Sequence, residues 1–327
     1  MAGSRLLTAL RSGVLNFGPA ARIGVFRPPA DFDASDLPDQ LHMVQGFKPA
    51  FDALSAAGQV VSVAPEPPYD AIIVCVPRAK DEARELIGSA RAMTDGPVVV
   101  DGQKTDGVEG LLREIRRRAE VGEVISKRHG KLFAFTGGDF SDWAALGRPK
   151  EVAGFYTVPG VFSADGVDPG SAMLAPALPV SLKGRVADLG AGWGYLSRAV
   201  LERDSVEEVH LIEAEHAALE CARRNVTDPR AHFYWADARR FQPEAVFDAI
   251  VCNPPFHQGR AADQGMGRGF IAAAAGMLKP SGTLWLVANR HLAYEAALAE
   301  AFADAQEVAG DRSFKVFHAR KPRRGRR

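Results

Sequence analysis

The sequence contains few cysteines and no long apolar run. Three cysteines are present, Cys75, Cys221 and Cys252, and none of them belongs to a Cys-x-x-Cys pair. This spacing argues against a disulfide framework and against zinc, and it favours a reducing compartment. The longest apolar runs, 71–76 and 271–275, are far shorter than the roughly 18 residues that a bilayer-spanning helix needs. We therefore expect a cytoplasmic protein with no membrane segment and no metal.

The sequence also lacks net charge, but its charges are unevenly distributed. The chain has 40 Lys and Arg residues against 40 Asp and Glu residues, and six of the basic residues lie in the last eight positions, 320–327. The rest of the chain therefore carries a net charge of about −6. We expect 320–327 to form a basic tail, which either solubilises the chain or binds phosphates. The neutral total does not exclude a nucleic acid partner.

The chain repeats the pattern of a parallel α/β sheet. Short β-rich runs alternate with helical stretches from residue 60 onward, and the alternation restarts after a segment rich in Gly, Pro and Ser at about 147–179. The run YDAIIVCVP at 69–77 also resembles FDAIVCNPP at 247–255. We therefore expect a duplicated domain. The first copy has no Gly-rich turn, and its expected counterpart of the polar run 253–256 is 76–79, which begins with Val76 and lacks the polar residue. Only the second copy should therefore be catalytic.

A glycine-rich turn follows the first predicted strand of the second half. Asp188 ends an apolar run, and Gly190, Gly192 and Gly194 precede a helical stretch. The spacing is G-x-G-x-G, whereas dinucleotide sites have G-x-G-x-x-G. An acid two residues before the first glycine suits a ligand with cationic groups better than a pyrophosphate. Glycine turns of this kind also occur for structural reasons alone.

Two more acids end the next two predicted strands. Glu213 lies 25 residues after Asp188, where it can accept both hydrogen bonds of a ribose diol, and Asp237 can accept from an adenine amino group. A single Asp at a strand end is usually a helix cap, but three acids at successive strand ends predict a ligand at that edge. The second half thus resembles class I S-adenosylmethionine-dependent methyltransferases. The resemblance implies S-adenosylmethionine as cofactor, with Asp188 and the glycines at its methionine end.

A polar and aromatic run follows another apolar predicted strand. It contains Asn253, Pro254, Pro255 and Phe256. An exocyclic amine on a planar base is a poor nucleophile, because the ring delocalises its lone pair. The Asn253 side-chain oxygen and the Pro254 carbonyl can accept its N–H groups and direct the lone pair at a methyl group beside Asn253. Pro255 stiffens the loop, and Phe256 offers a face on which the base stacks.

The wider sequence context narrows the resemblance. The Asn-Pro-Pro-Phe run resembles the motif of methyltransferases that modify adenine N6, guanine N2 or glutamine N5. Together with 161–163, 168–174 and 284–295, it is similar to the bacterial ribosomal RNA small-subunit guanine-N2 methyltransferase family (methyltransferase C) and its large-subunit relative. The segments 46–49 and 101–107 carry a weaker likeness in the first half. Ala293, where this family usually has Pro, is a departure.

The resemblance implies an α/β protein with two Rossmann-like methyltransferase domains. A degenerate domain, 1–148, would position the substrate, and a catalytic domain, 149–319, would contain a mostly parallel sheet of the seven-stranded type. The expected activity is methylation of guanine N2 in 16S rRNA of the small ribosomal subunit, by a monomer that everts the target base. Besides Phe256, the residues expected at the RNA, or else simply solvated, are Arg290, His291, Arg323 and Arg324.

Four alternatives remain open from the sequence. The substrate could be a guanine N2 of 23S rRNA, a DNA adenine N6 or a protein glutamine N5. The chain could also be an RNA-binding ribosome assembly factor that keeps the fold without turnover. Asn253 together with an intact turn at Gly190 favours an enzyme, since a pure binding protein needs neither.

Overall fold

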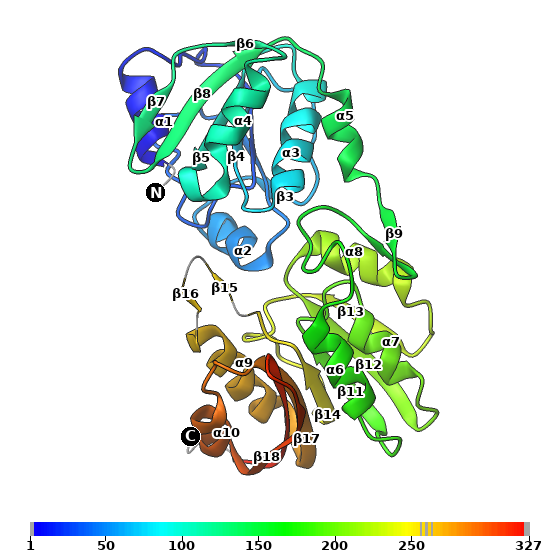
Figure 1. Ribbon diagram of the computed structural model, residues 1–327. Helices are drawn as coiled ribbons and strands as arrows, with labels where there is room; N and C mark the ends of the chain where they lie inside the picture. Colours follow the sequence, from blue (N-terminus) through cyan, green and yellow to red (C-terminus); the bar gives the residue numbers. More distant parts are fainter. Residues whose placement is uncertain (1–2, 256, 259–260, 263, 324–327) are drawn as a thin grey trace. The chain divides into compact units, whose positions relative to one another are not determined.

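The computed structural model describes residues 3–255, 257–258, 261–262 and 264–323 (Figure 1). The chain divides into two compact units. The N-terminal unit comprises Met1–Pro149 and Val158–Gly160, and the C-terminal unit comprises Lys150–Thr157 and Val161–Arg327. Among the described residues, no helix is both long enough and apolar enough to cross a membrane.

The N-terminal unit is built on one sheet with the strand order β3-β2-β1-β4-β5-β8-β6, and β7 also pairs with β8. Strands β1 to β5 are parallel, and β8 is antiparallel to β5. The strands are β1 (Ile23–Phe26), β2 (Leu41–Val44), β3 (Val61–Ser62), β4 (Ala71–Cys75), β5 (Val98–Gln103), β6 (Glu120–Val121), β7 (Ile125–Lys127) and β8 (Gly130–Thr136). The helices are α1 (Gly3–Arg11), α2 (Lys48–Ala56), α3 (Lys80–Met93), α4 (Val108–Ile115) and α5 (Ser141–Ala144), with short 3-10 turns at Lys104–Asp106 and Ala145–Gly147.

The C-terminal unit repeats this order as β13-β12-β11-β14-β17-β19-β18, again with an antiparallel β19. The strands of this sheet are β11 (Gly184–Leu189), β12 (Val206–Glu213), β13 (Ala231–Trp235), β14 (Phe247–Cys252), β17 (Leu278–Asn289), β18 (Phe302–Gly310) and β19 (Phe314–Pro322). The helices are α6 (Pro169–Ala177), α7 (Tyr195–Leu201), α8 (His216–Asn225), α9 (Gln264–Met277) and α10 (Glu295–Ala301). Two short hairpins, β9 (Lys150–Val152) with β10 (Phe155–Thr157) and β15 (His257–Gln258) with β16 (Ala261–Ala262), complete the unit.

Helices cover both faces of each sheet (Figure 1). In the C-terminal unit α6, α7 and α8 pack on one face, and α9 and α10 pack on the other. Alternate strand residues serve the two cores: Val186 packs with the first group of helices, and Ala187 packs with the second. Burial on both faces explains why these strands read as continuous apolar runs. The predicted fold class, two Rossmann-like domains with a mostly parallel seven-stranded sheet in the second, is confirmed.

The strand registers align the two sheets residue by residue. The pairing of β1 with β4 and of β11 with β14 makes Ala71 the counterpart of Ala249, and Cys75 the counterpart of Asn253. The expectation that the counterpart of Asn253 is Val76 is therefore wrong by one residue. Strand pairing decides which positions are equivalent, and the prolines that suggested the other alignment lie beyond the strands.

The amino ends of the two sheets carry the same interactions. The backbone N–H of Arg22 donates to Asp70 at 2.8 Å, and the backbone N–H of Arg185 donates to Asp248 at 2.9 Å. A histidine on the neighbouring strand contacts an aromatic ring in each copy. The equivalent pairs are Arg22 and Arg185, His42 and His210, Tyr69 and Phe247, and Asp70 and Asp248. Shared hydrogen bonds at shared positions support a duplicated domain.

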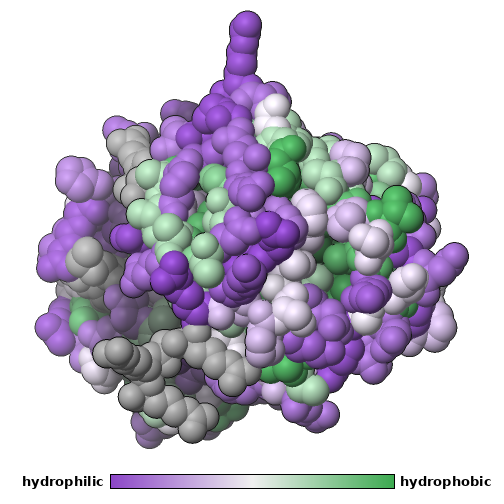
Figure 2. All heavy atoms as spheres, turned by 90° about the horizontal axis from the view of Figure 1, so that it is seen from below, coloured by the Kyte–Doolittle hydropathy of each residue, from purple (hydrophilic) through white to green (hydrophobic). Residues whose placement is uncertain are grey.

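Figure 2 shows a face on which hydrophobic residues lie in small groups between hydrophilic ones. Among the described residues, the large hydrophobic side chains with high exposure are Val60, Val63, Phe162, Val180, Val246 and Val308. Phe162 is the aromatic member of this set and is 51% exposed. An exposed aromatic ring is more notable than a single exposed valine, and this one belongs to the site described next.

Candidate active site

The predicted cofactor and catalytic residues lie at one edge of the C-terminal sheet. Strands β13, β12, β11 and β14 are parallel neighbours, so their carboxyl ends meet at the same edge. Asp188 lies near the end of β11, Glu213 ends β12, Asp237 follows β13 and Asn253 follows β14. The structure thus places these four polar side chains along one edge.

The turn between β11 and α7 needs its glycines. Gly190, Gly192 and Gly194 have φ values of 75°, 55° and 93°, in the left-handed region that favours glycine. A Cβ atom at Gly194 would lie 2.8 Å from the Val226 side chain, so this glycine lets the turn pack on the helix α8 end. A Cβ atom at Gly192 would meet nothing within 4 Å. The middle of the turn therefore faces open space that a ligand can enter.

Asp188 is completely buried. One carboxylate oxygen accepts a hydrogen bond from the Ser197 hydroxyl at 2.7 Å, and the other, Oδ1, has no partner among the described residues. Burial, with a further contribution from the Glu213 charge, raises the pKa of Asp188 to about 7, although the Ser197 hydrogen bond opposes the shift. A buried carboxylate with an unused oxygen is costly unless a donor or cation arrives. This side chain is therefore prepared for a cationic ligand.

Glu213 holds the glycine turn in place. Its Oε2 accepts from the backbone N–H of Gly192 at 2.8 Å, and its Oε1 accepts from the backbone N–H of Glu215 at 2.7 Å. Burial raises the pKa of Glu213 above its ordinary value. Each carboxylate oxygen can accept more than one hydrogen bond, so a ribose diol remains compatible with these contacts. The side chain thus connects the end of β12 to the turn after β11.

Asp237 already has a cationic partner. Its Oδ2 lies 2.7 Å from Nη2 of Arg239, and its Oδ1 accepts from the Arg239 backbone N–H at 3.0 Å. Burial alone would raise the pKa of Asp237, but the hydrogen bonds and charge of Arg239 hold it below its ordinary value. The carboxylate is therefore ionised at neutral pH. Its predicted contact with an adenine amino group stays a prediction.

Asn253 is fixed by two acceptors. The side chain is 9% exposed, and its Nδ2 donates to Asp168 Oδ1 and to Ser171 Oγ, each at 2.8 Å. Its Oδ1 is buried and has no partner among the residues that the structure describes. Because the amide nitrogen faces a carboxylate and a hydroxyl oxygen, the amide oxygen must point the other way. The result is an oriented, unused acceptor next to the glycine turn.

Asp168 and Ser171 also belong to this site, although the sequence alone did not predict them there. Asp168 is the N-cap of α6, with its Oδ1 accepting from the Ser171 backbone N–H at 2.9 Å, and Pro169 occupies the first helical position. Asp followed by Pro is a recognised helix start. This signal predicts the helix but not its proximity to Asn253, because Asp168 and Asn253 are 85 residues apart.

A small pocket joins these elements. It lies between the glycine turn, the start of α6 and Asn253, and the segment before α6 closes one side of it. Its walls include Phe162, Ser163, Gly190 and Trp193, and the Trp193 indole N–H donates to the Phe162 carbonyl at 2.9 Å. The exposed Phe162 ring is thus anchored beside the pocket through its own backbone. Pro254 is buried and Pro255 is exposed, while Phe256 lies outside the described residues.

The residues predicted at the RNA are not all placed together. Arg290 and His291 follow β17, at the same edge as Asn253, and His291 is exposed. The Arg290 guanidinium already donates to Glu307 Oε1 and to the Asp311 carbonyl, each at 2.6 Å. It therefore joins the end of β17 to β18 and to the turn after β18. A further contact of Arg290 or His291 with RNA stays a prediction.

Arg323 lies at the opposite edge of the sheet. It follows β19, which runs antiparallel to β17 and extends through Pro322. Residues 320–322 of the expected tail are therefore strand residues, and Arg320 pairs with Asp304. The nine residues of β19 span about 30 Å, so Arg323 lies far from the edge that holds Asn253. A contact of Arg323 with RNA stays a prediction, and Arg324 lies outside the described residues.

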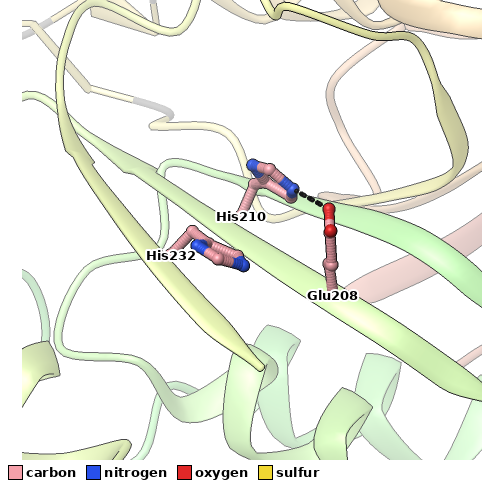
Figure 3. Close-up of side chains that lie close together, drawn as sticks. All are labelled: Glu208, His210 and His232. Atoms are coloured by element: carbon pink, nitrogen blue, oxygen red, sulfur yellow. Dashed lines mark hydrogen bonds and ion pairs between the residues drawn. The ribbon is translucent and has the colours of Figure 1, made fainter. Parts of the chain in front are cut away.

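A cluster of metal-ligand type lies away from this pocket. Glu208, His210 and His232 place one ligand atom each within 4.8 Å of one another (Figure 3). However, Arg185 Nε lies 2.8 Å from Glu208 Oε2, and Arg185 Nη2 lies 3.3 Å from His210 Nε2. A guanidinium in this position already neutralises the carboxylate and would repel a second cation. We therefore assign the cluster a packing role, and the expected absence of a metal stays a prediction.

The glycine turn, the acidic strand ends and the oriented amide share one edge of the sheet. This arrangement is typical of a nucleotide-binding α/β enzyme.

The family model described as "Methyltransferase small domain" matches residues 153–318. The ribosomal RNA small subunit methyltransferase C of Shewanella sp. (strain MR-4) is 30% identical over 263 residues, 76% of this chain and 76% of the relative. That of Acinetobacter baylyi is 27% identical over 92% of this chain and 95% of the relative.

A solved structure agrees over almost the whole chain. The "16S rRNA N2 G1207 methyltransferase" of T. thermophilus, solved in complex with AdoMet and guanosine, superposes with a TM-score of 0.80 and is 25% identical. The match covers 96% of this chain and 91% of that one. The chain therefore belongs to the ribosomal RNA small subunit methyltransferase C family. This confirms the family predicted from the sequence.

Proposed function

We propose that the protein transfers a methyl group from S-adenosylmethionine to the exocyclic N2 of a guanine in 16S rRNA of the small ribosomal subunit. The observation that carries this proposal is the buried Oδ1 of Asn253, an acceptor with no partner among the described residues. An acceptor in this position matches an amino group, which presents two donors, and not a carbonyl oxygen. The T. thermophilus structure, whose title names AdoMet and guanosine, supports the same pairing of ligands.

The residues at the sheet edge fit S-adenosylmethionine. The unpartnered Oδ1 of Asp188 and the open space beside Gly192 would receive its cationic methionine end. Glu213 would hold the ribose diol, and Asp237 would accept from the adenine amino group. When bound, the cofactor supplies a methyl group on a positively charged sulfur.

Asn253 and Pro254 prepare the target amine for attack. The Asn253 Oδ1 accepts one N–H, and the Pro254 carbonyl accepts the second. Both contacts favour a tetrahedral nitrogen, whose lone pair then points away from the ring system of the base. No strong base is needed, because the nitrogen becomes acidic once methylated and can release its proton to water. Phe256 would stack on the everted base.

The remaining roles follow from the duplicated fold. The N-terminal unit would position the RNA, since its sheet edge lacks the residues that bind a cofactor. Arg290, His291 and the basic residues from Arg323 onward would contact the RNA backbone away from the target base. We further propose that the enzyme works as a monomer in the cytoplasm, where ribosomal subunits are assembled.

The test measures methyl transfer to defined substrates. The protein is incubated with labelled S-adenosylmethionine and small subunits, large subunits, free 16S rRNA or DNA, and the modified nucleoside is identified by mass spectrometry. We expect N2-methylguanosine in 16S rRNA. Asn253→Ala should lower kcat by about 100-fold to 1,000-fold, whereas Cys75→Ala, the matched change at the equivalent position of the first copy, should leave kcat within about threefold. The absence of N2-methylguanosine from every RNA would refute the proposal.

A further inference from the structure

We propose that Asp168 and Ser171 are positioning residues that lock the Asn253 amide with its oxygen toward the target amine. The proposal deepens the proposed function and rests on it for the identity of the amine. The orientation of the Asn253 amide does not depend on which substrate carries the amine, so it can be tested independently of the substrate.

The two acceptors come from a single helix turn. Asp168 precedes α6 and Ser171 lies in its first turn, so both are placed by the start of one helix. Asp168 Oδ1 and Ser171 Oγ each lie 2.8 Å from Asn253 Nδ2, which uses both N–H groups of the amide. Ser171 is 7% exposed and Asn253 is 9% exposed, so water competes little with the bond between these two side chains.

The Asp168 carboxylate selects the orientation, and the Ser171 hydroxyl accepts the second N–H of the amide held in that orientation. Carboxylate oxygens accept hydrogen bonds, so an Asn253 oxygen turned toward Asp168 would meet lone pairs and not a donor. Turning the amide over would also present its N–H groups to an incoming amine, donor against donor. A charge-assisted bond from the amide nitrogen further draws electron density toward the carbonyl oxygen and strengthens it as an acceptor. Asp168 and Ser171 therefore decide whether Asn253 can hold an amino group.

A helix cap alone does not require this arrangement. The cap consists of the bond from the Ser171 backbone N–H to Asp168 Oδ1, at 2.9 Å. The Ser171 hydroxyl has no part in that bond, and it accepts from Asn253 instead. The Ser171 side chain is thus free to be changed without removing the cap, which separates a positioning role from a structural one.

The first experiment observes the amide directly. The sequence contains four asparagines, so selective ¹⁵N-asparagine labelling of the full chain gives few side-chain signals, and Asn253→Ala identifies the pair from Asn253. We expect both Asn253 N–H signals to exchange slowly with water in the wild type. In Ser171→Ala one of them should shift and exchange faster. Unchanged Asn253 signals in Ser171→Ala would overturn the proposal, whether or not the protein methylates RNA.

The second experiment separates kcat from binding. Ser171→Ala and Asp168→Asn, which keeps a good N-cap side chain, should each lower kcat by about 10-fold. The Kd for S-adenosylmethionine, measured by calorimetry, should stay within about threefold. The matched control is Ala172→Gly, which weakens the same helix at an exposed position and keeps both acceptors. An equal fall of kcat in Ala172→Gly, or wild-type kcat in both acceptor variants, would refute positioning.

Discussion

The carboxyl edges of the two sheets differ at the positions proposed to bind the cofactor or the target amine. Aligned by strand register, the pairs in the C-terminal and N-terminal copies are Asp188 and Val25, Gly190 and Arg27, Glu213 and Gln45, and Asn253 and Cys75. Each change removes a carboxylate, a flexible turn or a polar amide. The two copies have the same strand order, so these side chains, and not the fold, distinguish the copy proposed to bind the cofactor.

The edge of the first copy is occupied by its own side chains. Arg27 replaces the first glycine of the turn and lies 3.1 Å from Glu82. Gln45 donates to the Pro28 carbonyl at 2.7 Å and accepts from the Phe47 backbone N–H at 2.8 Å. A fixed guanidinium would repel a cationic cofactor, and Gln45 is committed to holding its own loop. At this edge of the first copy, the polar side chains therefore bond to one another and to their own loop.

The helix before the first strand shows the same exchange. In the first copy Arg5 of α1 binds Asp101 of β5 at 2.6 Å, and both side chains are buried. Burial raises the pKa of Asp101 to about 6 even though the Arg5 charge opposes the shift. In the second copy Asp168, at the start of α6, binds Asn253 instead. The segment before the first strand therefore contributes a residue to a buried ion pair in one copy and to an oriented amide in the other.

The largest effect is expected when the second copy is given the arginine of the first. In Gly190→Arg, a side chain at φ 75° strains the turn and places a cation at the cofactor's methionine end. We expect no measurable binding of S-adenosylmethionine by calorimetry and no methyl transfer. Arg27→Gly, the reverse change, should leave binding at one site per chain. A second binding site in Arg27→Gly would show that the first copy lost its site through Arg27 alone.

A smaller effect is expected in the pH dependence of stability, because the buried Asp188 can titrate and its apolar counterpart Val25 cannot. Asp188 has a pKa of about 7 in the folded protein, because burial and then the Glu213 charge disfavour its ionised form. Below about pH 4 both folded and unfolded states hold the proton, so the contribution of Asp188 to stability is fully present. Between about pH 4 and 7 only the unfolded state ionises, and stability falls by up to about 4 kcal/mol.

Asp188→Asn removes this titration. We expect the free energy of unfolding, measured by urea denaturation without ligand, to fall less between pH 5 and 8 in the variant than in the wild type. Binding of a cation should also release a proton from Asp188 near pH 7, which calorimetry in buffers of different ionisation enthalpy detects. Identical pH slopes in variant and wild type would contradict the assignment.

The grouping of the predicted cofactor residues at one sheet edge was predictable from the sequence, because its signals are local. The glycine turn lies within a few residues of Asp188, and the strand ends are marked by apolar runs. The orientation of Asn253 was not predictable, because its partners come from a helix 85 residues away. The end of β19 was not predicted, because residues 320–322 are part of a basic run that is typical of a tail. Charged residues such as Arg320 occur on exposed strands as well as in disordered tails.

The smallest effect is expected at the amino edge, where the two copies agree. Asp70→Ala removes the acceptor of the Arg22 backbone N–H, and Asp248→Ala removes the acceptor of the Arg185 backbone N–H. Each change should lower stability by about 0.5–1.5 kcal/mol, the net contribution of an ordinary hydrogen bond. Both variants should keep kcat within about threefold of the wild type, because neither side chain lies at the pocket.

Scanning calorimetry of the full chain tests whether this amino-edge bond acts in both copies. If the two units unfold in separate transitions, Asp70→Ala should lower the midpoint of one and Asp248→Ala the midpoint of the other. Lys279 also donates to Asp248, at 2.7 Å, so the shift in the second copy should be the larger. A loss of activity in Asp248→Ala with both midpoints unchanged would mean that the shared edge contributes to catalysis, and the contrast between a common scaffold and one chemical edge would fail.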